Sequence, residues 1–262
     1  MVDRITQEGI YALLPEPIKA GLCIEVLEST PSTNDYLKQK APGRTCTYYV
    51  VIAEKQTRGK GRRGKNFLSP RGCGIYLSVR FQIQDTSRTY AQELTALSSV
   101  AACRAIETHT SKQAFIKWPN DVYCDGKKVC GILCESQVGA YTGNVATYIT
   151  GIGINVYKSE ELDQGAQNGG YLALNEEAGL RNRLAASLIT EFVLLLEQGI
   201  DKAQEEYRKR SILIGQNILV EYDDLPSVPA HVQDINTRFQ LVIRYQDGSL
   251  DTLDIGNFSI KF

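Results

Sequence analysis

The chain has 262 residues, 43% of them hydrophobic and 23% charged, and its formal net charge is −1. Such a chain is long enough to bury a large core, and its balanced charge excludes a protein that coats nucleic acid through overall positive charge. The sequence contains no stretch of about 18 apolar residues and no apolar leader near its start, so we expect a cytoplasmic protein without a membrane segment.

The seven cysteines and two histidines lack the spacing of a cross-linked or metal-bound framework. The cysteines are odd in number, no pair has the Cys-x-x-Cys spacing, and the histidines are His109 and His231. We therefore expect free thiols in a reducing compartment, with neither a disulfide framework nor a zinc site.

In the first half of the chain, β-branched and aromatic runs alternate with helical patterns. We predict strands over residues 21–28, 45–54 and 74–83. A short helix between the first two strands begins at Ser32 or Thr33 and ends before Pro42. A long, largely buried helix is predicted over residues 89–110.

The second half continues this mixture before its character changes. We predict a strand over 114–118, a hairpin over 121–138 that turns at Asp125-Gly126, and a strand over 144–157. A polar, glycine-rich loop is expected over 158–170, and an amphipathic helix or helix pair over 181–210. After Arg210, five short strands without a helix predict a small β-barrel appended to an α+β domain.

The most unusual segment is KQTRGKGRRGK, residues 55–65, which holds six basic residues and three glycines. Gly59, Gly61 and Gly64 spell the dinucleotide motif G-x-G-x-x-G, and residues 59–65 spell most of a P-loop. Both motifs need a helix to begin at the loop, and the following NFLSPRGCG predicts none. Asn66 also stands where a P-loop needs Ser or Thr.

Three other interpretations of this loop remain open. A nucleic-acid site would suit the charge, but no aromatic residues are interleaved as a stacking platform. A merely solvated loop is the plainest interpretation. The third is a mobile lid, because glycines loosen the backbone, like charges oppose compaction, and an anionic ligand would relieve the repulsion and order the loop.

A second unusual segment is KWPNDVYCDGKKVCGIL, residues 117–133. It holds the only tryptophan, the adjacent Asn120 and Asp121, and lysines on both sides of them. A turn whose polar side chains cap the backbone would explain Asn120 and Asp121. A small-molecule site built at strand ends would explain them equally well.

Together these segments resemble the biotin–protein ligases. That family's pattern is Ser-Thr-Asn, then Gln followed by Gly-Arg-Gly-Arg-Arg-Gly, then Ser-Pro, Lys-Trp-Pro-Asn-Asp, Lys-hydrophobic-x-Gly-Ile-Leu and Gly-x-Gly-x-Asn. The resemblance covers residues 22–262, with every motif in the family's order. The matching segments are Ser32-Thr33-Asn34, Gln56, Gly59-Lys60-Gly61-Arg62-Arg63-Gly64, Ser69-Pro70, Lys117-Trp118-Pro119-Asn120-Asp121, Lys128-Val129-Cys130-Gly131-Ile132-Leu133 and Gly151-Ile152-Gly153-Ile154-Asn155.

The resemblance implies both a fold and a reaction. The fold would be α+β, with a class II synthetase-like catalytic domain over residues 1–213, built on a mixed β-sheet packed with helices, and an SH3-like β-barrel over 214–262. The reaction would join biotin and ATP into biotinoyl-5′-AMP with release of pyrophosphate. Biotin would then pass to a lysine of a biotin carboxyl carrier domain of a biotin-dependent carboxylase. Mg²⁺ would be held mainly through the ATP phosphates.

The resemblance also implies roles for individual residues. The biotin pocket would comprise Ser32, Thr33, Asn34, Gln56, Lys60, Gly61, Arg62 and Lys128. The nucleotide would contact Arg63, Lys65, Phe67, Asn120, Asp121 and Asn155. The catalytic residues would be Arg62, which retains the intermediate, Lys128, which stabilises charge in the first step, and Asp121, which orients or deprotonates the incoming amine.

Two departures from the family pattern bear on nucleotide affinity. Lys60 stands where the family has Arg, so it keeps the charge but loses the bidentate fork. Phe67 stands where the family often has Trp, so it keeps an aromatic face but no indole N–H.

Two alternatives of different kinds remain. A lipoate–protein ligase would follow the same two-step logic, although the basic loop and Lys-Trp-Pro-Asn-Asp favour biotin. A biotin-responsive repressor would need a DNA-binding domain, for which the residues ahead of Gly21 are too few, so we expect no DNA partner. A homodimer through an exposed sheet edge is compatible with the sequence.

Overall fold

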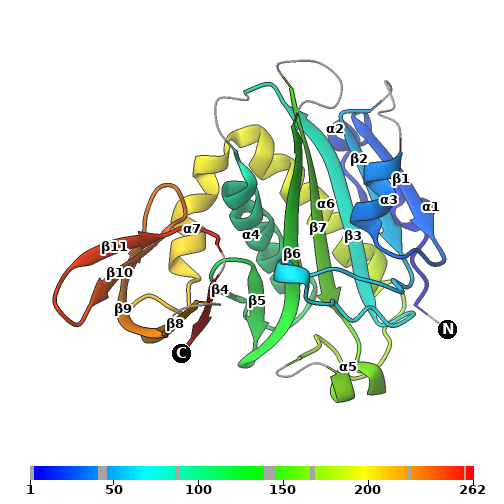
Figure 1. Ribbon diagram of the computed structural model, residues 1–262. Helices are drawn as coiled ribbons and strands as arrows, with labels where there is room; N and C mark the ends of the chain where they lie inside the picture. The colour runs from blue at the N-terminus through cyan, green and yellow to red at the C-terminus, as the bar shows by residue number, and fades with distance from the viewer. Residues whose placement is uncertain are drawn as a thin grey trace.

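The computed structural model describes residues 3–40, 46–85, 89–138, 145–165, 169–222, 226–256 and 258–262. Within them the main element is a seven-stranded mixed sheet in the order β1-β2-β3-β7-β6-β5-β4 (Figure 1). Only β1 and β2 pair in parallel, and the other neighbours are antiparallel. Its strands are β1 (Leu22–Leu27), β2 (Tyr48–Ala53), β3 (Gly74–Ile83), β4 (Phe115–Lys117), β5 (Asp121–Cys124), β6 (Lys127–Val138) and β7 (Ala146–Asn155).

The predicted hairpin over 121–138 is confirmed. Asp125 and Gly126 both have positive φ, 51° and 72°, which is the backbone of a two-residue type I′ turn. The turn brings Asp121 opposite Gly131 in the β5–β6 register. Asp121 and Gly131, ten positions apart in the sequence, therefore lie side by side, and both line a pocket.

Helices cover the two faces of this sheet unequally. The long helices α4 (Ala91–His109) and α6 (Leu180–Gln198) pack on one face, and the short helix α3 (Thr33–Gln39) packs on the other (Figure 1). Alternation along β2 follows this division, since Val50 and Ile52 join the large core and Val51 packs beneath Leu37 of α3. Ser32 caps α3, as one of the two predicted caps, while Pro42 lies outside the described residues.

The remaining helices are short. They are α1 (Gln7–Leu13), α2 (Glu16–Lys19), α5 (Glu160–Gly165), the 3₁₀ turns η1 (Arg62–Gly64) and η2 (Ile200–Ala203), and α7 (Gln204–Lys209). The prediction of an irregular loop over 158–170 is wrong where α5 forms. Three acidic residues in its first turn favour the start of a helix. The prediction considered only that the segment is polar and rich in glycine.

The C-terminal segment forms a second, antiparallel sheet in the order β11-β10-β9-β8-β12. Its strands are β8 (Asn217–Tyr222), β9 (Val228–Ile235), β10 (Leu241–Tyr245), β11 (Leu250–Leu253) and β12 (Phe258–Lys261). The five strands are as predicted, and the sheet that they form is not a closed barrel, because β11 and β12 are opposite edges of the described sheet. The arrangement is consistent with an open SH3-like module. The division at residue 213 stays a prediction.

The two sheets meet at the turn between β4 and β5. The Trp118 ring stacks on Phe258 with centroids 6.0 Å apart, and its indole N–H donates to the Phe239 carbonyl at 2.8 Å. From the other side, the buried Tyr207 hydroxyl donates to the Pro119 carbonyl at 3.0 Å. The turn that carries Asn120 and Asp121 is therefore held by both α7 and the second sheet.

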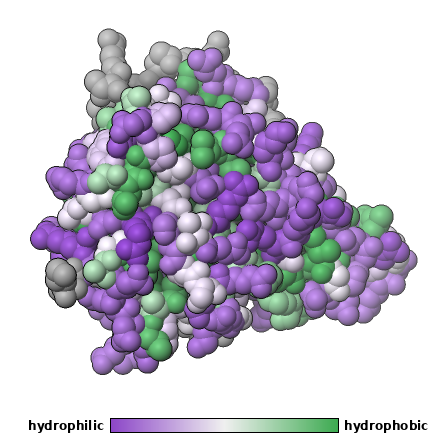
Figure 2. Space-filling model, turned by 180° about the vertical axis from the view of Figure 1, so that it is seen from behind, coloured by the Kyte–Doolittle hydropathy of each residue, from purple (hydrophilic) through white to green (hydrophobic). Residues whose placement is uncertain are grey.

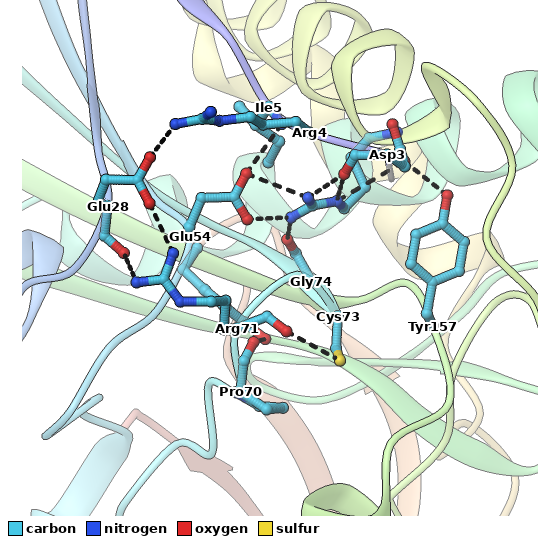
Figure 3. A network of polar contacts seen from close by, with 12 residues as sticks. Asp3, Arg4, Ile5, Glu28, Glu54, Pro70, Arg71, Cys73, Gly74 and Tyr157 are labelled. Atoms are coloured by element: carbon cyan, nitrogen blue, oxygen red, sulfur yellow. Dashed lines mark hydrogen bonds and ion pairs between the residues drawn. The ribbon is translucent and has the colours of Figure 1, made fainter. Parts of the chain in front are cut away.

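A buried ionic network fastens the start of the chain to the end of β2 (Figure 3). Arg181, 1% exposed, donates to Glu54 Oε2 at 2.9 Å and to the Gly74 carbonyl at 3.1 Å. Asp3 accepts hydrogen bonds from the Arg181 amide at 2.9 Å and from the Tyr157 hydroxyl at 2.6 Å. Since Glu54 immediately precedes residue 55, this network also fixes the root of the basic loop.

Replacing Arg181 with Met should lower the free energy of unfolding by about 3 kcal/mol, because two buried carboxylates would lose their cation. Urea denaturation would measure the change. Arg183→Met is the matched control, since its side chain is 35% exposed and pairs with the exposed Glu177. That control should cost less than about 1 kcal/mol. Equal losses in the two variants would contradict a special role for the network.

The side of the molecule that faces away from the viewer in Figure 1 has a mainly hydrophilic surface, on which hydrophobic residues form small separate patches (Figure 2). The large exposed apolar side chains of the whole described chain come from separate elements, among them Leu13, Leu174, Leu194 and Leu250. A search of the described helices finds none with the length and apolar character needed to cross a membrane.

Candidate active site

A pocket of about 290 Å³ lies on the face of the main sheet that carries α3. Its floor is formed by β6 and β7 and one wall by the start of α3. The basic loop covers it, and the β4–β5 turn and β12 close the far end. One cavity thus collects residues from positions 32 to 260, and a small ligand would be enclosed on several sides.

The wall at the α3 end consists of neutral amides and hydroxyls. The Gln56 carboxamide oxygen accepts from the Thr33 backbone N–H at 2.9 Å, and its amide group donates to Ser69 Oγ at 2.9 Å. Ser32, Thr33 and Asn34 are at most 3% exposed, yet all three line the pocket. Such a wall suits a neutral head group that both donates and accepts hydrogen bonds.

The basic loop folds back on itself as a tight lid, which we define as residues 59–67. The Gly61 N–H donates to the Lys65 carbonyl at 2.7 Å, and the Phe67 N–H donates to the Gly59 carbonyl at 2.8 Å. A Cβ on Gly59 would lie 2.4 Å from the Phe67 carbonyl oxygen, so this position requires glycine. No helix follows within residues 65–73, as predicted.

Two cationic side chains hold the lid across the pocket. Lys60 pairs with Asp35 of α3 at 2.7 Å, and Arg62 donates from Nη1 to Asn120 Oδ1 at 3.1 Å. Burial lowers the pKa of Arg62, while the neighbouring Asp121 opposes that shift. The lid therefore lies over the pocket with one anchor on each side. The expected change of the lid from disordered to ordered on binding an anionic ligand stays a prediction.

The end of the pocket under the lid is rich in cations. Lys128 Nζ lies 2.6 Å from Asp121 Oδ1, and Lys65, Arg63 and Lys117 also line the cavity. Burial, with Lys128 and Lys65 nearby, lowers the pKa of Lys117, and Asp121 opposes this. Lys117 and Lys128 are partly buried, and such a concentration of cations is suited to an anionic ligand, whose charge would interact strongly with them.

Three glycines on β6 and β7 leave space directly above the sheet, where other side chains can pack. Gly131 and Gly153 are paired across β6 and β7, and the Phe67 ring lies on them. A Cβ on Gly153 would lie 2.4 Å from Phe67 Cε1, and one on Gly151 would lie 2.5 Å from Asn34 Oδ1. The glycines therefore make room for two predicted site residues.

The structure brings nearly all predicted site residues together. Every one of them except Asn155 lines the pocket. Asn155 is 6% exposed, and its amide group donates to the Gly170 carbonyl at 3.1 Å, while its Oδ1 has no described partner. Its assignment to the nucleotide stays a prediction.

Sequence reasoning missed three kinds of site residue. It gave no role to the floor glycines, although Gly131, Gly151 and Gly153 lie within the matched segments 128–133 and 151–155. It also missed Phe258, Ser259 and Ile260 of β12, which line the pocket from the far end of the chain. The third kind lies behind the wall, where Ser78 and Glu135 contact Asn34.

Solved structures share this fold. The Aquifex aeolicus biotin protein ligase in complex with biotin and ATP matches with a TM-score of 0.73, 21% identity, and 91% of this chain and 98% of that chain covered. An apo structure of the same Aquifex protein matches with a TM-score of 0.67 over 91% of this chain and 98% of that one, at 19% identity. The fold of this chain is the one that these two ligase structures have.

The chain belongs to the Biotin/lipoate A/B protein ligase family, whose model matches residues 26–161, just over half of its length. A Mycobacterium tuberculosis biotin–[acetyl-CoA-carboxylase] ligase is 32% identical over 84% of this chain and 82% of its own length. The Escherichia coli bifunctional ligase/repressor BirA is 33% identical over 75% of this chain. That match spans 64% of BirA's own length.

Proposed function

We propose that the chain is an ATP-dependent biotin–protein ligase that makes biotinoyl-5′-AMP and passes biotin to a lysine of a carboxyl carrier domain. The observation that carries the proposal is one pocket with two chemically different ends. A neutral amide and hydroxyl wall suits the ureido ring of biotin, and the cationic end under the lid suits a triphosphate. The family and its biotin-ligase relatives agree with this assignment.

In the first half-reaction a biotin carboxylate oxygen attacks the α-phosphorus of ATP, and the bond to pyrophosphate breaks. The two reactants are both anionic, so they must be held together by fixed cations. Lys128 and Arg62 both line the pocket, and both lie close to Asp121. An arriving anion would replace Asp121 as the partner of Lys128.

In the second half-reaction the acceptor amine attacks the acyl carbon and AMP leaves. Once pyrophosphate has gone, Asp121 is free to accept a hydrogen bond from the amine and orient it. The lid keeps water away from the mixed anhydride in the interval between the two steps. Phe67, on its glycine floor, would cover the adenine with its ring.

Magnesium would arrive with the triphosphate. Within the described parts of the chain, no group of three or more His, Cys, Asp or Glu side chains is placed to hold a metal ion. Asp121 is the one carboxylate among the described lining residues. Mg²⁺ is commonly held by one or two carboxylates together with phosphates and waters, so this donor set fits. The ion would neutralise phosphate charge.

The direct test is transfer of labelled biotin to a purified carboxyl carrier domain, with and without ATP and magnesium. Label on one carrier lysine, dependent on ATP, is the expected result. Offering labelled lipoate with a lipoyl domain in parallel tests the other branch of the family. Transfer of lipoate without transfer of biotin would overturn the proposal.

Gly153→Ala should raise the KM for ATP about tenfold, because the new Cβ displaces the Phe67 ring from the floor and weakens its stacking on adenine. Steady-state ATP titrations would measure the change. Gly21→Ala is the matched control, since its Cβ would meet nothing closer than 3.5 Å. An unchanged KM for ATP in Gly153→Ala would show that the ring does not contact the nucleotide.

A further inference from the structure

The Asn34 side chain is held by three polar groups at the back of the pocket wall. Its Nδ2 donates to Glu135 Oε2 at 2.7 Å and to the Leu133 carbonyl at 3.3 Å. Its Oδ1 lies 2.6 Å from the hydroxyl of Ser78, which is fully buried. A carboxylate and a backbone carbonyl can only accept, so the orientation of the Asn34 carboxamide is fixed.

This orientation dictates where the neighbouring hydroxyl hydrogens lie. Ser78 has one hydrogen but makes two short oxygen contacts, to Asn34 Oδ1 at 2.6 Å and to Thr33 Oγ1 at 2.7 Å. Since Asn34 Oδ1 cannot donate, the Ser78 hydrogen lies in the first contact. Thr33 Oγ1 also lies 3.1 Å from Gln56 Oε1, which can only accept, and its single hydrogen serves the shorter contact, the 2.7 Å one to Ser78. Hydrogen bonds therefore run in one direction, from Thr33 through Ser78 and Asn34 to Glu135.

The direction of this chain decides what the wall offers a ligand. The Thr33 hydrogen is used within the protein, so Thr33 Oγ1 presents only lone pairs to the pocket. Ser32 Oγ accepts from the Asp35 N–H at 3.4 Å and keeps its own hydrogen to donate. Gln56 Nε2 keeps one N–H after its bond to Ser69. One acceptor beside two donors complements a group with an N–H next to a C=O.

Glu135 is the last residue in this series of hydrogen bonds and the only charged one. It does not line the pocket, and its other oxygen pairs with Lys38 at 2.6 Å. The carboxylate thus has an interaction with a cation on one side and with the Asn34 amide on the other. A bond to an ionised acceptor is stronger than one between neutral groups, so Glu135 holds Asn34 more firmly than the longer bond to Leu133 does.

We propose that Glu135 is a positioning residue that sets the hydrogen-bond polarity of the biotin wall. It acts through Asn34 and Ser78, directs the Ser78 hydrogen away from Thr33, and so leaves the Thr33 lone pairs to accept from a ureido N–H. This inference rests on the proposed function, because it concerns how that pocket reads the head group of biotin.

The test is a double-mutant cycle on biotin affinity, measured by calorimetry with the full chain. Glu135→Met removes the acceptor at similar length, and Ser78→Ala breaks the same chain one link away. Each should weaken biotin binding about tenfold and leave ATP affinity within about twofold of wild type. Because both break one chain, the double variant should lose little more than either single variant. Glu16→Met, an exposed Glu paired with Lys19, is the matched control.

Each outcome bears on one hypothesis. A wild-type protein that does not bind biotin would overturn the proposed function before the cycle begins. Biotin affinity unchanged in Glu135→Met, or losses that multiply in the double variant, would overturn the positioning role alone. Glu135→Gln, which keeps the size and one acceptor oxygen, should bind biotin within about threefold of wild type. A tenfold loss there would also overturn it, and this variant serves even if the Met variant does not fold.

Discussion

Lys128→Ala should lower the rate of biotin-dependent ATP–pyrophosphate exchange by about 10²–10³-fold, with little change in the folded structure. Lys128 lies on β6 at the edge of the pocket floor, and its ammonium is 2.6 Å from Asp121 and 3.4 Å from where a Cβ on Gly131 would lie. It is therefore placed where the carboxylate of biotin and the α-phosphate would meet. Without this cation, the two anions approach each other beside an Asp121 that has lost its partner, and the transition state loses a large part of its charge stabilisation.

The two half-reactions separate this role from a general loss of activity. Chemically prepared biotinoyl-5′-AMP bypasses the first step, so transfer from it should fall much less than exchange does. Lys127→Ala is the matched control, because Lys127 is the adjacent lysine, is exposed and does not line the pocket. ATP–pyrophosphate exchange at the wild-type rate in Lys128→Ala would show that Lys128 has no role in the first step.

Local sequence patterns were sufficient for the strands and the turns, and the family resemblance located most of the pocket residues. The Asp125-Gly126 turn, for example, requires positive φ at two positions, which few residue pairs accept. The motif residues also lie at strand ends or in turns, where polar groups are not needed for the core. Such residues stand out in a sequence, so the resemblance could locate Gln56, Arg62 and Lys128.

The features that were missed depend on contacts between distant segments. Ser78 and Glu135 lie inside strands, and only the β3-β7-β6 order brings them to the same side chain of α3. Likewise, Phe258 reaches the pocket because the second sheet packs on Trp118. A closed barrel would need its two edge strands to pair, and periodicity predicts strands but not which edges meet.

Arg62→Ala should leave adenylate formation partly intact but release biotinoyl-5′-AMP about 10- to 100-fold faster. Arg62 is the residue through which the lid contacts the β4–β5 turn, with its Nη1 3.1 Å from Asn120 Oδ1. Burial lowers its pKa, but from a value so high that the guanidinium stays charged at every pH at which the protein is folded. With Ala, the lid loses this contact, and the Lys60–Asp35 pair on the other side is partly exposed and therefore weak.

Release can be followed by forming the adenylate with labelled ATP in the absence of an acceptor and filtering after dilution. A freed mixed anhydride acylates lysines indiscriminately, so the variant should also label bystander proteins that the wild type leaves unmodified. Arg58→Ala removes a cation from the same basic segment, but Arg58 is exposed and outside the pocket lining, so it should retain the intermediate normally. If Arg62→Ala retained it equally long, closure of the lid would have to depend on Lys60 or on the backbone of the lid itself. The cationic segment would then act through its total charge, and no single guanidinium would be required.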